Sequence, residues 1–157
     1  MSGRVLQRLS ELGLELPPVV APVAAYVPAV LDGDRVWTAG QVPMVDGALP
    51  VTGKVGIGEG LVPPERAAEM AGVCALNALA AVASVIDDLD RIVRVVKVVG
   101  FVASAPDFTG QPAVINGASE LLQAVLGDLG QHARSAVGVA ALPMDAPVEV
   151  EMVVSFR

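Results

Sequence analysis

The chain has few of the residues on which nucleic-acid binding depends. Aromatic side chains make up 3% of its 157 residues, and ten Lys and Arg stand against seventeen Asp and Glu, for a net charge of −7. Proteins that bind RNA or DNA use basic patches to neutralise phosphates and aromatic rings to stack on bases. The composition therefore argues against nucleic acid as a partner.

Cysteine and long apolar runs are also scarce. Cys74 is the one cysteine, so no intrachain disulfide can form, and its apolar neighbours predict a small buried side chain. No apolar run reaches the roughly 18 residues that cross a bilayer, because Gly72, Asn77 and Ser84 interrupt the stretch 70–86. The N-terminus has no cationic start followed by an apolar segment. We therefore expect a cytoplasmic protein with no membrane partner.

Apolar residues nevertheless account for 54% of the chain, which has a mean hydropathy of +0.62. Most of this excess is Ala and Val rather than Leu and Phe. The length fits one domain with a real core, so we predict a single domain over residues 1–157, with residues 1–18 as an N-terminal helical extension. The apolar excess indicates that this domain buries surface against copies of itself.

Hydrophobic periodicity predicts three helices and six extended segments. The helices cover residues 2–13, about 64–86 and about 113–126. The extended segments are Tyr26–Leu31, Arg35–Thr38, Val42–Val45, Ile92–Ala103, about Ala133–Ala141 and about Pro147–Phe156. Asp-Gly pairs at 32–33 and 46–47 mark turns, and residues 50–63 are expected to form a surface loop.

The order of these segments predicts an α+β fold, in which two helices pack on one face of a mixed or antiparallel sheet. The Val-rich segment 92–103 is expected to be a central strand buried on both faces. The last two strands are expected to form a hairpin through residues 142–145. No segment remains to cover the second face of the sheet, so oligomerisation is the simplest way to cover it.

Three polar groupings are expected to be structural. Asp87, Asp88 and Asp90 follow the second helix and offer too few oxygens for a calcium site, so they predict a solvated turn. The Gly-rich segment 53–60 lacks the Gly-Lys-Ser/Thr ending of a phosphate loop, and we expect a flexible rim loop. His132 has no Ser-His-Asp or metal-ligand grouping around it, which favours a structural or solvent-facing role.

The segment around Arg134 is the candidate for a ligand site. Small side chains at 133, 135 and 136 leave room beside this large cation. Side chains alternate along a strand, and pairing Glu149 near Gly138 or Ala140 in the predicted hairpin puts Glu149 on the face of Arg134, roughly 13–20 Å away between backbones. The residues alone also allow a sheet-surface Arg134 and a solvent-facing Glu149.

The same region resembles the C-terminal signature of the RidA/YjgF family. Residues 132–143 hold the family's Arg-Ser pair and Val-Ala-x-Leu-Pro run, and residues 148–151 match its Val-Glu-Val/Ile-Glu strand at a fitting spacing. In the N-terminal half, residues 38–43 are similar to the family's Ser-Gly-Gln-Ile-Pro segment, and Tyr26 stands where the family has a Tyr before its first strand. The resemblance covers nearly the whole chain after residue 19.

This resemblance implies a chorismate-mutase-like fold, a homotrimer with active sites in clefts between subunits, and hydrolysis of reactive enamines and imines to a 2-keto acid and ammonia. It implies no metal and no organic cofactor. Arg134 would hold the substrate carboxylate, Glu149 would position or activate the attacking water, and Tyr26 would line the cleft. Asn116 matches a polar residue on the family's second helix, with a spacing to Arg134 that is longer by one.

Several pocket positions depart from the family and indicate a divergent branch. Ala136 replaces the usual Cys two residues after the Arg, Ala39 replaces the Ser before Gly-Gln, and residues 24–25 are Ala-Ala where the family has Gly-Pro. The less polar pocket makes a non-catalytic carboxylate-binding trimer, acting as a sensor or a partner-binding module, the alternative to the deaminase. Endoribonuclease activity, described for some L-PSP-like members, is disfavoured by the acidic charge.

Overall fold

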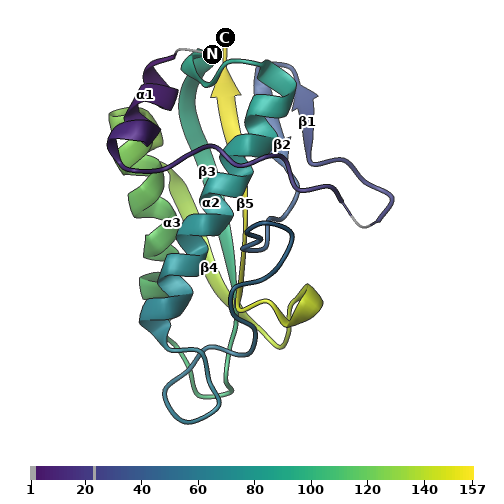
Figure 1. Cartoon of the computed structure of the whole chain (residues 1–157), viewed down its shortest axis with the longest axis vertical. Coiled ribbons are helices and arrows are strands. Elements are labelled where there is room, and N and C mark those ends of the chain that lie inside the picture. Colours follow the sequence, from purple (N-terminus) through teal and green to yellow (C-terminus); the bar gives the residue numbers. More distant parts are fainter. Residues whose placement is uncertain (1–2, 23) are drawn as a thin grey trace.

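The computed structural model describes residues 3–22 and 24–157, which form an α+β fold built on one five-stranded sheet (Figure 1). The helices are α1 (Arg4–Glu11), α2 (Pro64–Ile86) and α3 (Gln111–Leu126), with short 3-10 turns η1 (Leu89–Arg91), η2 (Gly127–Gly130) and η3 (Pro143–Asp145). The strands are β1 (Ala29–Asp32), β2 (Arg35–Thr38), β3 (Ile92–Ala103), β4 (Ala133–Val139) and β5 (Val148–Phe156). The predicted helices are confirmed within a few residues at their ends.

The sheet has the strand order β1-β2-β5-β3-β4, in which β3 and β4 are parallel and the other neighbours are antiparallel. Figure 1 shows α2 and α3 running side by side in front of this sheet, and the two helices also contact each other extensively. The predicted mixed sheet with two helices on one face is therefore confirmed.

The predicted hairpin between the last two strands is wrong. β4 pairs in parallel with one edge of β3, because α3 carries the chain back across the sheet before β4 begins. β5 pairs antiparallel with the other edge of β3 and also with β2. Alternating side chains fix which face of a strand is buried, but they do not specify which neighbour the strand pairs with. β4 is therefore an edge strand, and β3 separates it from β5.

Some predicted segments differ from the structure in extent. β1 begins at Ala29 instead of Tyr26, since the chain bends before Pro28, a residue with no N–H to give to a sheet. Residues 42–45 form no strand, although Gln41 pairs with Val150 in an isolated bridge. Residues 50–63 are irregular as predicted, but Val55 is fully buried and pins this loop to the domain.

The prediction that β3 is buried on both faces is half right. Val95, Val98 and Val102 face the helices and are fully buried. Their neighbours on the other face, Val99 and Phe101, are only half-buried. No helix of the described residues lies on that second face.

Helix α2 owes its Ala-rich sequence to close packing. Its described surroundings are the sheet on one side and α3 on another, and most of its Ala residues are fully buried. By length and composition α2 could cross a membrane, yet 67% of its apolar window is buried inside the protein. It is therefore a core helix of this fold.

Asp90 has a role that the predicted solvated turn missed. Its carboxylate accepts hydrogen bonds from the backbone N–H groups of Arg4 (2.7 Å) and Val5 (2.8 Å), at the start of α1. These bonds, first that from Val5, lower the pKa of Asp90. Gly3, the residue at the N-cap position of α1, provides no side-chain bond, so Asp90 caps this helix from a distant part of the chain.

The α2–α3 contact predicts opposite results for two glycines. A Cβ at Gly117 of α3 would overlap the carbonyl group of Ala68, whereas a Cβ at Gly72 of α2 would lie 3.5 Å from the nearest atom, an ordinary contact. We expect Gly117→Ala to lower the free energy of unfolding by about 1–3 kcal/mol. Gly72→Ala should leave it unchanged or raise it by up to about 1 kcal/mol, because Ala favours a helix. Urea denaturation measures the free energy of unfolding of both variants. A higher value for Gly117→Ala than for Gly72→Ala would contradict this packing.

Candidate functional site

Arg134 lies on the edge strand β4 and its side chain turns toward α3. Its register partner on β3 is Val98, which is fully buried on the helix side of the sheet. Since register partners share a face, Arg134 also projects to the helix side. No strand of the described residues pairs with the outer edge of β4, so the half-buried guanidinium lies at the margin of the sheet.

Neutral acceptors hold this guanidinium. Nη1 donates to Oδ1 of Asn116 (2.8 Å) and to Oγ of Ser119 (3.1 Å), and Nη2 donates to the carbonyl oxygen of Pro112 (3.3 Å). Guanidinium has five N–H donors, so these bonds leave one N–H on Nη2 and one on Nε without an acceptor among the described residues. No ion pair forms there between Arg134 and a carboxylate. The positive charge of Arg134 is thus not paired with a carboxylate of the described residues, and two of its N–H groups stay available for a ligand.

His132 orients this cluster through Ser119. His132 Nδ1 lies 2.6 Å from the carbonyl oxygen of Gly130, which can only accept, so Nδ1 carries the proton. In the neutral ring Nε2 is then an acceptor, and Ser119 Oγ, 2.9 Å away, donates to it. Ser119 in turn accepts from Arg134. The structural role predicted for His132 is compatible with this chain of bonds, whereas the link to Arg134 through Ser119 was not foreseen from the sequence.

Glu149 lies on the opposite face of the sheet from Arg134, contrary to the prediction that they share one face. Its register partner is Phe101, three residues along β3 from Val98, the partner of Arg134. An odd number of residues separates opposite faces of a strand. The two backbones are roughly 14 Å apart from strand and residue spacing, but the sheet lies between the side chains. Within one chain these two residues do not meet.

Glu149 is a half-buried carboxyl group that is a weaker acid than an ordinary glutamic acid. It accepts no hydrogen bond from the described residues, and it lies against Gly40, where a Cβ would overlap its Oε1. Burial, and secondly the negative charge of Glu151, raise its pKa. A carboxylate whose pKa is raised toward neutrality is suited to take a proton from water. The Gly-Gln pair at 40–41 therefore has a physical reason, since only glycine leaves room for Glu149.

Tyr26 lies far from Arg134 in the chain's own fold. It is 51% exposed and stands in the bend before β1. β1 and β4 are the two outer strands of the sheet, with three strands between them. Of the predicted site residues, the structure brings together Arg134 and Asn116 alone, and it leaves Tyr26 and Glu149 on other surfaces.

Other sequence candidates carry no chemistry in the structure. Cys74 is fully buried, as predicted, and burial followed by the charge of Glu149 raises the pKa of its thiol. In residues 3–22 and 24–157, no cluster of three or more His, Cys, Asp or Glu side chains could hold a metal ion. The loop 53–60 has an exposed Ile57 at its tip and no strand directly before it.

The hydrogen bonds of His132 predict its tautomer. Because Gly130 accepts from Nδ1, the neutral ring should carry its proton there, and Ser119→Ala should not change this. His132 is the one histidine of the chain, so its ring ¹⁵N shifts can be assigned without ambiguity in an NMR spectrum. A neutral ring protonated at Nε2 would contradict the described bonds.

The raised pKa of Glu149 predicts a stability change with a defined sign. A carboxyl group whose pKa is higher in the folded state favours the protonated form, so stability is lost as pH rises from the ordinary value of 4.5 through the raised one. Glu149→Gln removes this loss and should melt at a higher temperature than wild type at pH 7, by roughly 2–4 °C for each kcal/mol. The difference should shrink toward zero below pH 4. Glu59→Gln, in an exposed loop, is the matched control, and a lower melting temperature of Glu149→Gln at pH 7 would refute the assignment.

Comparison with known proteins places this geometry in a family. The YjgF/chorismate mutase-like family model matches residues 6–155. The protein TCP17 of Trypanosoma cruzi is 43% identical over 157 residues, covering 99% of this chain and 96% of that protein. The crystal structure of Atu1372 from Agrobacterium tumefaciens has 44% identity and a TM-score of 0.90, covering 98% of this chain and 93% of the other.

Escherichia coli YjgF is more distant from this chain. Its crystal structure has 27% identity and a TM-score of 0.63, covering 88% of this chain and 94% of the other. The structure of Atu1372 therefore matches this chain more closely, and over more of its length, than the structure of YjgF does. The chain belongs to the YjgF/RidA family and lies in a divergent branch together with Atu1372 and TCP17.

Proposed function

We propose that the protein hydrolyses small 2-imino acids and their enamine tautomers to 2-keto acids and ammonia, at clefts between subunits of a homotrimer. The observation that carries this proposal is the state of Arg134. Its guanidinium is held by neutral acceptors and keeps two N–H groups without a partner among the described residues. A carboxylate can accept two parallel hydrogen bonds from such a pair of donors.

The placement of the other residues supports a site shared by two subunits. Arg134 projects to the helix side at one edge of the sheet, and Glu149 projects to the face that no described helix covers. Trp37, Val30 and Val137 lie on that open face and are 43–52% exposed, which is unusual for large apolar side chains. If a second copy packs its β4 edge against this face, its Arg134 approaches Glu149 of the first copy.

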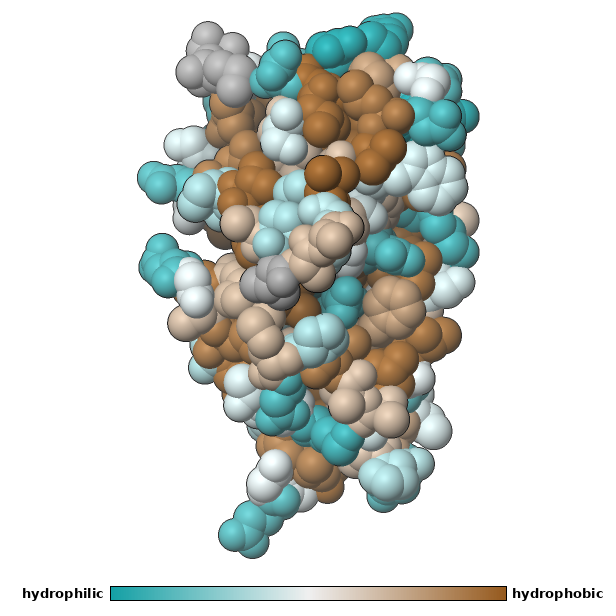
Figure 2. Space-filling view, turned by 90° about the vertical axis from the view of Figure 1, so that its right-hand side faces the viewer, coloured by the Kyte–Doolittle hydropathy of each residue, from teal (hydrophilic) through white to brown (hydrophobic). Residues whose placement is uncertain are grey.

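The β1 side of the molecule offers a further apolar surface for such an assembly. Figure 2 shows broad apolar areas on this side, and Tyr26, Val27 and Leu31 are among its exposed residues, at 49–57%. Packing of this side against another subunit would bring Tyr26 into a cleft that its own chain does not form. Trimer formation would also account for the high apolar content of the sequence.

The chemistry requires little from the protein beyond positioning. Arg134 binds the carboxylate, and Asn116 keeps the guanidinium in place. Glu149 accepts a proton from a water molecule while the oxygen of that water forms a bond to the imine carbon. Protonated Glu149 returns this proton to the nitrogen, which gives a carbinolamine. The hydroxyl group of the carbinolamine then loses its proton to the nitrogen as the C–N bond breaks, so that the carbon becomes a ketone and ammonia leaves. The raised pKa of Glu149, caused first by burial and then by Glu151, makes it a stronger base than an ordinary carboxylate.

Carboxylate binding without catalysis is the second candidate. Ala39 and Ala136 stand where the family resemblance expects Ser and Cys, so the cleft has two fewer polar groups than a typical member. The same Arg134 would then bind a carboxylate ligand in a sensor or a partner-binding module. In both candidates Arg134 binds a carboxylate, but only the deaminase converts the bound molecule to a product.

The deaminase is tested by ammonia release from freshly generated 2-imino acids, small and bulky. We expect acceleration over buffer by the wild type, and a loss of roughly 30- to 100-fold in kcat/KM for Arg134→Ala, because a charge-assisted bidentate pair is lost. Arg66→Ala, which removes an exposed arginine paired with Glu69, should retain full activity. Ligand-dependent stabilisation without turnover would favour the binding module, and no effect of Arg134→Ala on either readout would remove both candidates.

A further inference from the structure

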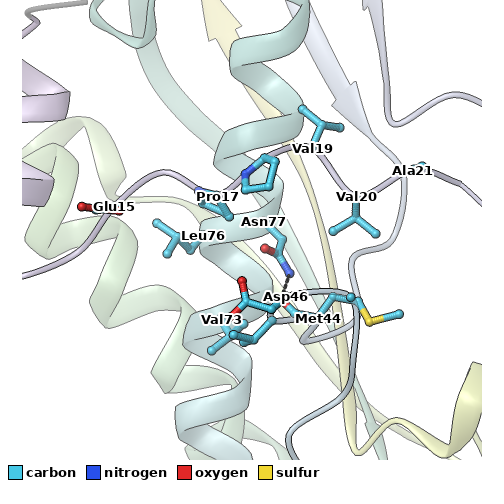
Figure 3. Close-up of a pocket in the computed structure, with 13 residues that line it drawn as sticks. Glu15, Pro17, Val19, Val20, Ala21, Met44, Asp46, Val73, Leu76 and Asn77 are labelled. Atoms are coloured by element: carbon cyan, nitrogen blue, oxygen red, sulfur yellow. Dashed lines mark hydrogen bonds between the residues drawn. The ribbon is translucent and has the colours of Figure 1, made fainter.

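A second pocket lies outside the proposed cleft and is lined by other residues. It has a volume of about 540 Å³ and opens between the N-terminal connector 15–21, the turn 44–47 and the outer surface of α2 (Figure 3). Small-molecule sites commonly enclose 300–1,000 Å³. None of Arg134, Glu149, Tyr26 and Asn116 lines it, so its occupation is a question separate from that of the cleft.

The walls of this pocket are mostly apolar. Pro17, Val19 and Val20 come from the connector, Met44 from the turn, and Val73 and Leu76 from α2. Figure 3 shows how the connector, the turn and α2 each contribute side chains to the lining of this pocket. Such a lining favours a ligand with an apolar body, because displacing water from both surfaces is favourable.

Asn77 provides one directed polar group at the base of the pocket. It is only 2% exposed, and its Nδ2 donates to the carbonyl oxygens of Val42 and Met44, both at 3.1 Å. These bonds fix the amide, and Oδ1 receives no hydrogen bond from the described residues. Since no fully buried side-chain oxygen of those residues lacks a partner, this oxygen reaches open space. Figure 3 shows it turned away from the bonded nitrogen, which leaves an acceptor for a ligand N–H or O–H.

The charged residues of the pocket are both acidic. Glu15 and Asp46 belong to its lining, and no Lys or Arg does. An anionic ligand would be repelled by these two carboxylates and by the amide oxygen of Asn77, none of which can donate a hydrogen bond to it. A protonated amine would meet an acceptor at the base and negative charge beside it. The pocket therefore has the reverse preference to that of Arg134.

We propose that this pocket binds a small organic amine in its ammonium form, with an apolar body against α2 and the connector. The ammonium group lies near Asn77 Oδ1 and Asp46, and the hydrocarbon contacts Val73 and Leu76. The proposal does not rest on the deaminase, because it uses none of the residues assigned to that activity.

Three probes with one apolar body separate the contributions. Phenethylamine, 2-phenylethanol and phenylacetate differ in the head group, which is cationic, neutral or anionic. In titrations followed by methyl NMR, we expect phenethylamine to shift the signals of Met44, Val73 and Leu76 most strongly at a given concentration. The alcohol should bind the same place more weakly, and phenylacetate should leave these methyls unchanged, even if it shifts signals near Arg134.

Two variants and a control locate the binding. Val73→Phe fills the pocket from α2 and should abolish the methyl shifts at Met44 and Leu76 for both the amine and the alcohol. Asp46→Asn keeps a residue type that tolerates its positive φ of 51°, and it should weaken amine binding roughly threefold without affecting the alcohol. Asp128→Asn, an exposed carboxylate outside the pocket, should change neither.

The proposal is overturned by any of three results. These are phenylacetate shifting the pocket methyls as strongly as the amine, amine binding that survives Val73→Phe, or no shift by any probe at millimolar concentration. An enzyme that is inactive on imino acids but binds phenethylamine as described would refute the deaminase and leave this proposal standing.

Discussion

Strand β5 holds the two halves of the sheet together. It pairs antiparallel with β3 from Val148 to Phe156 along one edge, and with β2 from Val153 to Ser155 along the other. Within residues 3–22 and 24–157, the β1–β2 hairpin is hydrogen-bonded to the rest of the sheet through β5, next to the bridge from Gln41 to Val150. Every second residue of β5, among them Val150, Met152 and Val154, is buried on the face of the sheet that packs against α2. Glu149 and Glu151 are thereby directed to the other face.

This arrangement divides the functional groups between two surfaces. The helix side is closed by α2 and α3, whose close approach depends on Gly117 and on small side chains. The open side carries Glu149 together with exposed apolar residues. Arg134 reaches the helix side only at the free edge of β4. A cleft that contains both Arg134 and Glu149 therefore needs two copies of the chain, and the account of function depends on this division.

Much of the fold could be predicted from the sequence, because its signals are local. The periodicity of residues 64–86 and 113–126 defines the helices, and Asp-Gly at 32–33 defines the first hairpin. Strand neighbours could not be predicted, since pairing partners lie far apart along the chain and alternate patterns fit several orders. That single gap produced the error in the site, where a supposed hairpin placed Arg134 and Glu149 on one face. The capping of α1 by Asp90, and the bonds from His132 through Ser119 to Arg134, depend on contacts that no spacing rule reveals.

The central claim is that Arg134 of one subunit acts with Glu149 of another. Coexpression of Arg134→Ala and Glu149→Gln chains with different tags, followed by isolation of the mixed species, tests it most directly. Each variant alone should be almost inactive on 2-imino acids. In each isolated mixed trimer about one cleft in three should be restored, since a restored cleft takes its intact Arg134 and its intact Glu149 from different chains. Mixed assemblies that form but remain as inactive as either variant alone would contradict the shared cleft.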